Sequence, residues 1–200
     1  MKKLVWLISL LFLIISIFGI LQIFSFSLNF YKDQFRPVEI SESKILNVEN
    51  VYGFLQDKNP INIDFTKSEY EHLDDVKIIF NLVYLVFRIS LFLLVGLSIF
   101  LIFISKYSII LNWLIFWSLV SLSLMLLLIS FIVLDFGSAF NLFHELLFPQ
   151  WNRSFPEESL LIQLFPESFF VSISRYIFLS ISGVSAFVML TSLLLKKVLK

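Results

Sequence analysis

Residues 79–105 read IFNLVYLVFRISLFLLVGLSIFLIFIS, and after a single lysine, Lys106, residues 107–134 read YSIILNWLIFWSLVSLSLMLLLISFIVL. Each stretch exceeds the roughly 20 mainly apolar residues that a transmembrane helix needs. Because the turn at Lys106 is very short, the two stretches are predicted to form an antiparallel hairpin of membrane-spanning helices.

Two further apolar stretches, residues 4–24 and 176–195, are also long enough to span a bilayer. The first follows Lys2 and Lys3, like the charged start of a signal peptide. Its apolar part is longer than the roughly 7–15 residues of a cleaved signal, and no small-residue cleavage site follows it. We therefore expect a retained signal anchor and an all-α membrane protein, in which four spans form a transmembrane bundle.

The composition supports a membrane protein and excludes several other classes. The 200-residue chain is 58% hydrophobic and 15% charged, whereas soluble domains average roughly 45–50% apolar and about 25% charged residues. It has no cysteine, so disulfides, thiol catalysis and thiolate metal sites are excluded. Its net charge is zero, and no nucleic-acid partner is expected.

The distribution of lysine and acidic residues predicts the orientation, because cytoplasmic loops of membrane proteins carry an excess of Lys and Arg. The two termini and the hairpin turn carry lysines and no acidic residue: Lys2, Lys3, Lys106, Lys196, Lys197 and Lys200. The segments 29–77 and 135–175 are acidic instead. Both termini are predicted to be cytoplasmic and both acidic segments extracytoplasmic.

The chain therefore divides into five parts. They are residues 1–28 (first span), 29–77 (an extracytoplasmic cap), 78–134 (the hairpin), 135–175 (an extracytoplasmic or interfacial segment) and 176–200 (fourth span and cytoplasmic tail). We expect the small cap to have mixed α/β structure. Residues 47–56 favour a short helix, residues 62–65 alternate like a strand, and Thr66 or Ser68 is expected to cap the next helix.

The only two histidines, His72 and His144, lie at the predicted outer ends of spans. Imidazole, with an unperturbed pKa of about 6.5, is the side chain best suited to proton transfer near neutral pH. On a helix, His72 shares a face with Glu69 and Asp75, and a nearby carboxylate can orient an imidazole. The alternative is a solvated helix start, where acids favour the positive end of the helix dipole.

The segment after the hairpin favours a helix lying near the membrane interface. Phe140, His144 and Phe148 repeat at four-residue spacing, which puts His144 on an apolar face. We expect the two imidazoles to converge in one polar cleft at the outer leaflet. The alternative is a simple interfacial anchor whose histidine faces water, with Trp151 in an aromatic belt.

Two arginines are further candidates. Arg88 lies inside the second span, where a charge is a functional hypothesis by default, although its side chain can instead snorkel outward. Arg175, at the outer end of the fourth span, either binds a phosphate or carbonyl group or anchors the interface. No metal is expected, since a catalytic zinc site usually needs three protein ligands in tight geometry.

Three blocks of residues carry a resemblance to a known family. They are Glu69-x-x-His72-Leu-x-Asp75-Val-Lys77, Phe143-His144-x-x-x-Phe148-x-x-Trp151 and Leu164-Phe-Pro-Glu-x-Phe-Phe170. Together with four spans and an outer cap, they resemble the small bacterial integral-membrane family that contains the lipoprotein intramolecular transacylase. The region 153–159 departs from the family pattern, which has an acid immediately before the Leu-Ile pair, where Ser159 stands here.

The resemblance implies an enzyme that needs no cofactor. The family moves the sn-2 acyl chain of a diacylglyceryl lipoprotein to the α-amino group of its N-terminal cysteine, which gives the lyso-form lipoprotein. The histidine pair of the family maps onto His72 and His144 as acid/base catalysts. The supporting or substrate-binding residues are then Glu69, Asp75, Glu145, Trp151 and Arg175.

The same resemblance implies a monomer in the bacterial cell membrane that acts on lipoproteins among membrane lipids, with its active site at the extracytoplasmic face. Two alternatives stay open. One is another membrane lipid acyltransferase or hydrolase that uses a serine, although no Gly-x-Ser-x-Gly motif occurs. The other is a non-enzymatic envelope assembly protein, which would have no need to bring the two imidazoles within a few ångströms.

Overall fold

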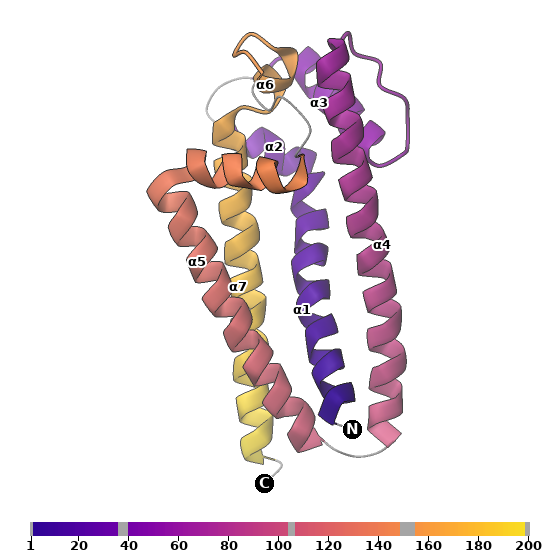
Figure 1. The fold of residues 1–200 in the computed structure, drawn as a ribbon, viewed down its shortest axis with the longest axis vertical. Coiled ribbons are helices and arrows are strands. Elements are labelled where there is room, and N and C mark those ends of the chain that lie inside the picture. The colour runs from indigo at the N-terminus through magenta and orange to yellow at the C-terminus, as the bar shows by residue number, and fades with distance from the viewer. Residues whose placement is uncertain (1, 36–39, 104–106, 149–154, 199–200) are drawn as a thin grey trace. The chain divides into compact units, whose positions relative to one another are not determined.

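The computed structural model describes residues 2–35, 40–103, 107–148 and 155–198. Within these residues the chain forms seven helices (Figure 1). They are α1 (Lys2–Ser25), α2 (Leu28–Gln34), α3 (Glu42–Leu55), α4 (Lys67–Phe103), α5 (Tyr107–Leu147), α6 (Leu160–Leu164) and α7 (Glu167–Val198). The prediction of an all-α membrane fold is confirmed.

Four of these helices are long and apolar enough to cross a membrane, as predicted. The candidate spans are Trp6–Ser25, Lys67–Leu97, Ser108–Leu147 and Glu167–Val198. Three of them extend well beyond the apolar stretches predicted from the sequence. α4 and α7 begin earlier, at Lys67 and Glu167, and α5 ends later, at Leu147.

The prediction of a mixed α/β cap is wrong, because no strand occurs in the described part of the chain. Residues 62–65 lie in a loop, where the Asn62 amide donates to the Asn50 side-chain oxygen at 2.8 Å. A strand needs a partner strand to complete its hydrogen bonds, and here a side chain takes that place. The short helix predicted over residues 47–56 is confirmed, although α3 begins earlier, at Glu42.

The structure comprises two compact units. Unit 1 contains residues 1–22, 84–130 and 176–200, and its packing joins the apolar helices. Ile8 of α1 is buried against residues of α4 and α5: Leu94, Leu97, Ile109, Ile110 and Trp113. Between α5 and α7, the Ser185 hydroxyl donates to the Ser121 hydroxyl at 2.8 Å, and such small residues allow close approach of membrane helices.

Unit 2 contains residues 23–83 and 131–175, including both histidines. Its core is aromatic and forms around Tyr31 of α2, which is fully buried. The Tyr31 ring lies 5.9 Å from Phe165 and 5.5 Å from Phe169 between ring centroids. Its hydroxyl donates to the Leu164 carbonyl at 2.6 Å, and burial raises the pKa of Tyr31 well above its ordinary value. This bond ties α2 to the end of α6.

α3 ends in a turn that positions it against α4. The Lys58 amide donates to the Gly53 carbonyl at 2.8 Å and the Asp57 amide to the Phe54 carbonyl at 3.1 Å. These are the two bonds of a Schellman motif, which needs a left-handed residue after the cap. Asp57 takes that conformation, with φ of 58°.

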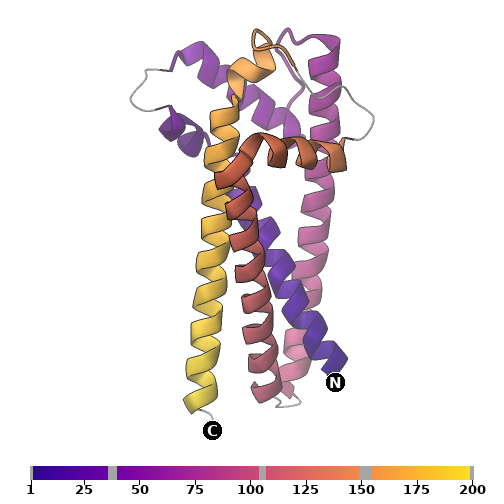
Figure 2. The same ribbon diagram turned by 60° about the vertical axis from the view of Figure 1, so that its left-hand side comes forward.

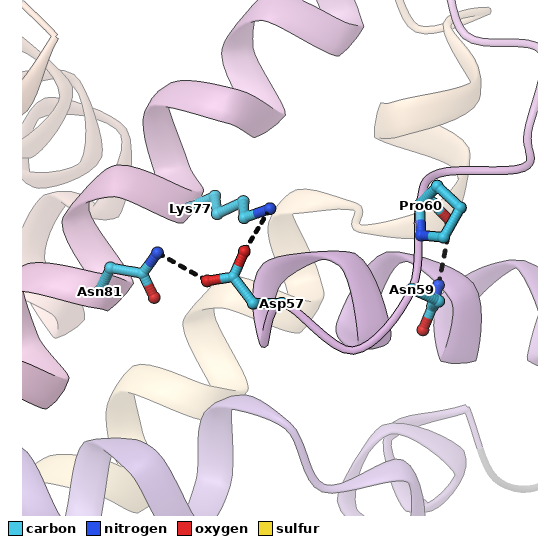
Figure 3. A network of polar contacts seen from close by, with 5 residues as sticks. All are labelled: Asp57, Asn59, Pro60, Lys77 and Asn81. Atoms are coloured by element: carbon cyan, nitrogen blue, oxygen red, sulfur yellow. Dashed lines mark hydrogen bonds and ion pairs between the residues drawn. The ribbon is translucent and has the colours of Figure 1, made fainter.

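The side chain of Asp57 then binds two residues of α4 (Figure 3). One oxygen pairs with the Lys77 ammonium at 2.6 Å, and the other accepts from the Asn81 amide at 2.9 Å. The hydrogen bond from Lys77 lowers the pKa of Asp57. The Lys77 ammonium also lies 4.4 Å from the Phe54 ring centroid, so this network holds α3 beside the helix that carries His72.

α5 contains a break in its helical backbone at Asp135, whose φ and ψ are −159° and 85°. Both ribbon views show the bend in this helix (Figures 1 and 2). The Asp135 carboxylate accepts from the Ser138 amide at 3.0 Å, which is the bond of a helix N-cap. The helical backbone thus breaks directly after Leu134, where the third span is predicted to end, and a second helical segment carries His144.

Candidate active site

His72 lies on the second turn of α4, and the start of that helix is capped as predicted. The Thr66 amide donates to the Glu69 carboxylate at 2.8 Å, and the Glu69 amide donates to the Thr66 hydroxyl at 3.3 Å. This reciprocal pair is a capping box, which satisfies two amides that a helix start otherwise leaves without partners. The backbone that precedes His72 is therefore well defined.

His144 lies on the last turn of α5, and its ring is anchored to its own helix. The ring nitrogen Nδ1 lies 2.8 Å from the Phe140 carbonyl oxygen. Because a carbonyl only accepts hydrogen bonds, Nδ1 carries the hydrogen in this contact. The lone pair of the neutral ring is therefore on Nε2. The Phe140 ring also lies 4.0 Å from the His144 ring between centroids.

The two imidazoles converge within unit 2. Their centroids are 6.2 Å apart and their planes are within 15° of parallel. The Phe148 ring contacts both, at 5.0 Å from His72 and 5.7 Å from His144, and Phe155 packs against His72 at 5.5 Å. The expected convergence is confirmed, although aromatic rings enclose the pair where we expected a polar cleft.

This geometry suits a pair that exchanges a proton with a bound molecule. Both rings are half-buried, and two imidazolium charges at this separation would repel each other. One neutral ring beside one protonated ring avoids that repulsion. Two imidazoles in unlike protonation states can act as a general base and a general acid.

Glu69 lies on the same helix, one turn before His72, and its carboxylate bonds to Thr66 and Leu161. Its side chain is buried, with 2% exposure. One oxygen accepts from the amide and the hydroxyl of Thr66, each at 2.8 Å, and the other accepts from the Leu161 amide at 3.0 Å. Glu69 thus joins α4 to α6.

Asp75, one turn after His72, differs from Glu69 in its bonding. The residue is half-buried, and its Oδ2 atom is buried without a hydrogen-bond partner among the described residues. A buried carboxylate oxygen in this state costs free energy unless a bound group supplies a donor. This oxygen can therefore accept a hydrogen bond from a bound group.

The other candidate residues differ in their exposure and in the unit to which they belong. Glu145 is exposed on α5, directly after His144, and Arg175 is exposed at the unit 2 end of α7. Arg88 belongs to unit 1, and Trp151 lies outside the described residues.

The sequence did not reveal Phe155, which packs on His72, because no local pattern marks it. Phe148 was detectable, because it continues the four-residue spacing with His144.

Comparison with known proteins gives a family match and a shared fold. The sequence profile of the family described as lipoprotein intramolecular transacylase Lit matches residues 3–170, which include both histidines. No curated protein matches the chain. The in meso structure of the membrane integral lipoprotein intramolecular transacylase Lit from Bacillus cereus is similar at a TM-score of 0.76 and 22% identity, over 100% of this chain and 99% of that chain.

Structures of two variants of the Bacillus cereus protein are also similar. In one a histidine is changed to arginine, and it has a TM-score of 0.68 and 22% identity over 98% of this chain and 92% of that chain. In the other a histidine is changed to alanine, with a TM-score of 0.68 and 23% identity over 100% and 96%. At such identities these likenesses show a common fold.

Proposed function

The chain belongs to the lipoprotein intramolecular transacylase (Lit) family, and from this premise we propose that it moves an acyl chain within a lipoprotein. The substrate is a diacylglyceryl lipoprotein. Its sn-2 acyl group passes from the glycerol oxygen to the α-amino group of the N-terminal cysteine. The product is the lyso-form lipoprotein, and no cofactor takes part.

The observation that carries this proposal is the pair of imidazoles 6.2 Å apart. An α-ammonium group, with a pKa of about 7.7–8.0, must lose a proton before it attacks. The departing glycerol alkoxide must gain one. A neutral imidazole serves the first step and an imidazolium the second, so two histidines at one site match both requirements of the reaction.

The bond changes balance without water or a further reactant. The neutral ring takes a proton from the α-ammonium, and the amine nitrogen attacks the sn-2 ester carbonyl carbon. The tetrahedral intermediate then breaks its bond to the glycerol oxygen, which takes a proton from the imidazolium, and the ring left neutral takes the second proton of the nitrogen as the amide forms. One proton in total passes to the solvent, since an ammonium group has become an amide. An amide and an alcohol replace an amine and an ester, and since both lie in one substrate molecule, catalysis consists mainly of positioning.

His144 is proposed to act through Nε2. Its Nδ1 hydrogen is donated to the Phe140 carbonyl, which sets the tautomer of the neutral ring. The Nε2 atom then accepts a proton if His144 is the base and releases one if it is the acid. Because both histidines come from one chain, the proposed site needs no second copy of the protein, and we propose that the enzyme acts as a monomer.

We propose that the site lies at the extracytoplasmic face, where the acyl chains of a lipoprotein remain in lipid while its head group enters the site. Glu145, Trp151 and Arg175 are proposed to contact the polar parts of that head group. Phe148 and Phe155 pack on the His72 ring. Their packing supports acyl transfer within the lipoprotein over hydrolysis, because aromatic walls exclude the water that would otherwise hydrolyse the ester.

The direct test is to express the chain in a bacterial host that makes the diacyl form, and to determine the mass of a reporter lipoprotein N-terminus. We expect a peptide that carries one N-linked acyl chain and a monoacylglyceryl group. A lipid hydrolase would instead release a fatty acid without N-acylation. An assembly protein would leave the diacyl form unchanged, and either result would reject the proposal.

Asp75 is predicted to hold the α-ammonium of the substrate. Asp75→Asn should lower kcat/KM by about tenfold to a hundredfold, because a hydrogen bond to a charged group contributes about 1.5–3 kcal/mol. Its melting temperature should change little, since asparagine keeps the shape of the side chain and removes the charge from a carboxylate with a buried, unpartnered oxygen. Asp74→Asn is the matched control, because that neighbouring residue is exposed and should tolerate the change. Equal activity of both variants would exclude the role for Asp75.

Both termini are predicted to be cytoplasmic. The prediction follows from the lysines of the termini and of the hairpin turn, set against the acidic segments 29–77 and 135–175. A reporter enzyme that is active only in the cytoplasm, fused after Lys200, should be active. The same reporter inserted within residues 57–61 should be inactive. The reverse pattern would place the active site at the cytoplasmic face.

A further inference from the structure

Glu69 joins two parts of the chain that are 92 residues apart. Its carboxylate is almost completely buried, and each oxygen accepts at least one hydrogen bond. Oε2 takes both donors of Thr66, at the start of α4, and Oε1 takes the amide of Leu161 in α6. The Ser159 hydroxyl also bonds to this carboxylate.

A buried carboxylate is retained without a large penalty only when such donors surround it. The capping of α4 requires only one of the two oxygens. The second oxygen is directed to another segment, so capping alone does not account for the burial of Glu69. The second function of Glu69 therefore depends on which residues are contacted by α6 and by the segment before it.

The segment held by Glu69 reaches His72 directly. It begins at Phe155, whose ring packs on His72 at 5.5 Å, and the Ser159 amide donates to the Pro156 carbonyl at 2.9 Å. Ser159 then caps α6 by accepting from the Ile162 amide at 3.2 Å. Local bonds therefore connect the anchor point at Leu161 to the ring that covers His72.

The same segment also reaches His144. At the end of α6, the Leu164 carbonyl accepts from the Tyr31 hydroxyl, and α7 begins three residues later. Phe170 of α7 packs on Phe140 at 5.3 Å, and Phe140 packs on His144. The position of α6 thus affects the surroundings of both imidazoles.

We infer that Glu69 is a positioning residue of the active site, which holds residues 155–164 against the first turns of α4 and thereby keeps the Phe155 ring on His72. The inference rests on the proposed function for its kinetic consequence, but its structural consequence can be measured separately. Glu69 does not contact the reacting atoms. It acts through the placement of His72 and its aromatic cover.

The test is Glu69→Gln, which keeps the shape but replaces one accepting oxygen by an amide group that faces a donor. We expect kcat to fall about tenfold to a hundredfold with little change in KM, since a misplacement of about 1 Å can cost a hundredfold in rate. Glu71→Gln is the matched control, because Glu71 is on the same helix and forms an ion pair of 3.7 Å with Lys67, one turn away. It should behave as wild type.

A second variant separates the two functions of the carboxylate. Thr66→Val removes the capping hydroxyl but leaves the bond from Glu69 to Leu161. It should lower the melting temperature while changing kcat less than Glu69→Gln does. If both variants lower kcat equally, Glu69 only caps α4 and the inference is overturned.

A readout independent of turnover is the rate at which diethyl pyrocarbonate modifies His72, measured by peptide mass spectrometry on the full chain. We expect Glu69→Gln to raise that rate severalfold, because Phe155 no longer covers the ring, whereas Glu71→Gln leaves it unchanged. If Glu69→Gln fails to fold, Ser159→Ala is the milder substitute and should change both readouts in the same direction.

The outcomes distinguish the inference from the proposed function. A wild-type chain without transacylase activity, combined with raised modification in Glu69→Gln, would reject the function and support the positioning role. An active wild type, with Glu69→Gln or Ser159→Ala equal to Glu71→Gln in both readouts, would reject the positioning role alone.

Discussion

Replacing either His72 or His144 by alanine is expected to reduce lyso-lipoprotein formation by about 10²–10⁴-fold, the usual contribution of a positioned acid or base. The two rings lie 6.2 Å apart and act in successive steps on one substrate. The double variant should therefore be little worse than either single one, because catalytic groups that act as a unit are not additive. The measurement is the mass of a reporter lipoprotein N-terminus.

The controls for this experiment follow from the anchoring of His144. His144→Asn keeps a donor near the position of Nδ1 for the Phe140 carbonyl, but it cannot exchange protons. It should be as inactive as His144→Ala while its melting temperature stays closer to that of the wild type. Full conversion by either alanine variant would remove that histidine from the mechanism, and conversion by the double variant would reject the mechanism.

The second large effect is expected on stability, at Tyr31. Tyr31→Ala should lower the free energy of unfolding by about 3–5 kcal/mol, the cost of deleting a fully buried aromatic side chain. The residue has no exposed surface and contacts Phe165 and Phe169. Tyr31→Phe should cost about 1–3 kcal/mol, because the buried Leu164 carbonyl loses its donor.

Unfolding of purified protein in detergent, followed by limited proteolysis of unit 2, measures both effects. Tyr70→Phe is the matched control, since Tyr70 is 44% exposed and exposed substitutions usually change stability by less than about 0.5 kcal/mol. A Tyr31→Ala chain as stable as this control would show that the aromatic core of unit 2 does not depend on Tyr31.

The elements that the sequence predicted correctly depend on local information. The four spans follow from runs of apolar residues, because the thickness of the bilayer sets the length that a helix needs. The cap at Thr66 follows from a side chain that bonds to the amide three residues away. The four-residue spacing of Phe140, His144 and Phe148 likewise placed His144 on an aromatic face.

The features that only the tertiary structure decided depend on distant partners. The alternation at residues 62–65 predicted a strand, but an Asn50 side chain occupies the place of the missing partner. The spacing of Glu69 and His72 placed them on one helix face, where a carboxylate can orient an imidazole, and the structure shows that the Glu69 carboxylate bonds to Leu161. The approach of Phe155 to His72 has no sequence signal at all. The sequence thus determined where the spans lie and which two histidines form the candidate pair, because periodicity and capping act within a few turns. The enclosure of that pair arises from packing between segments far apart in the chain, which no local pattern encodes.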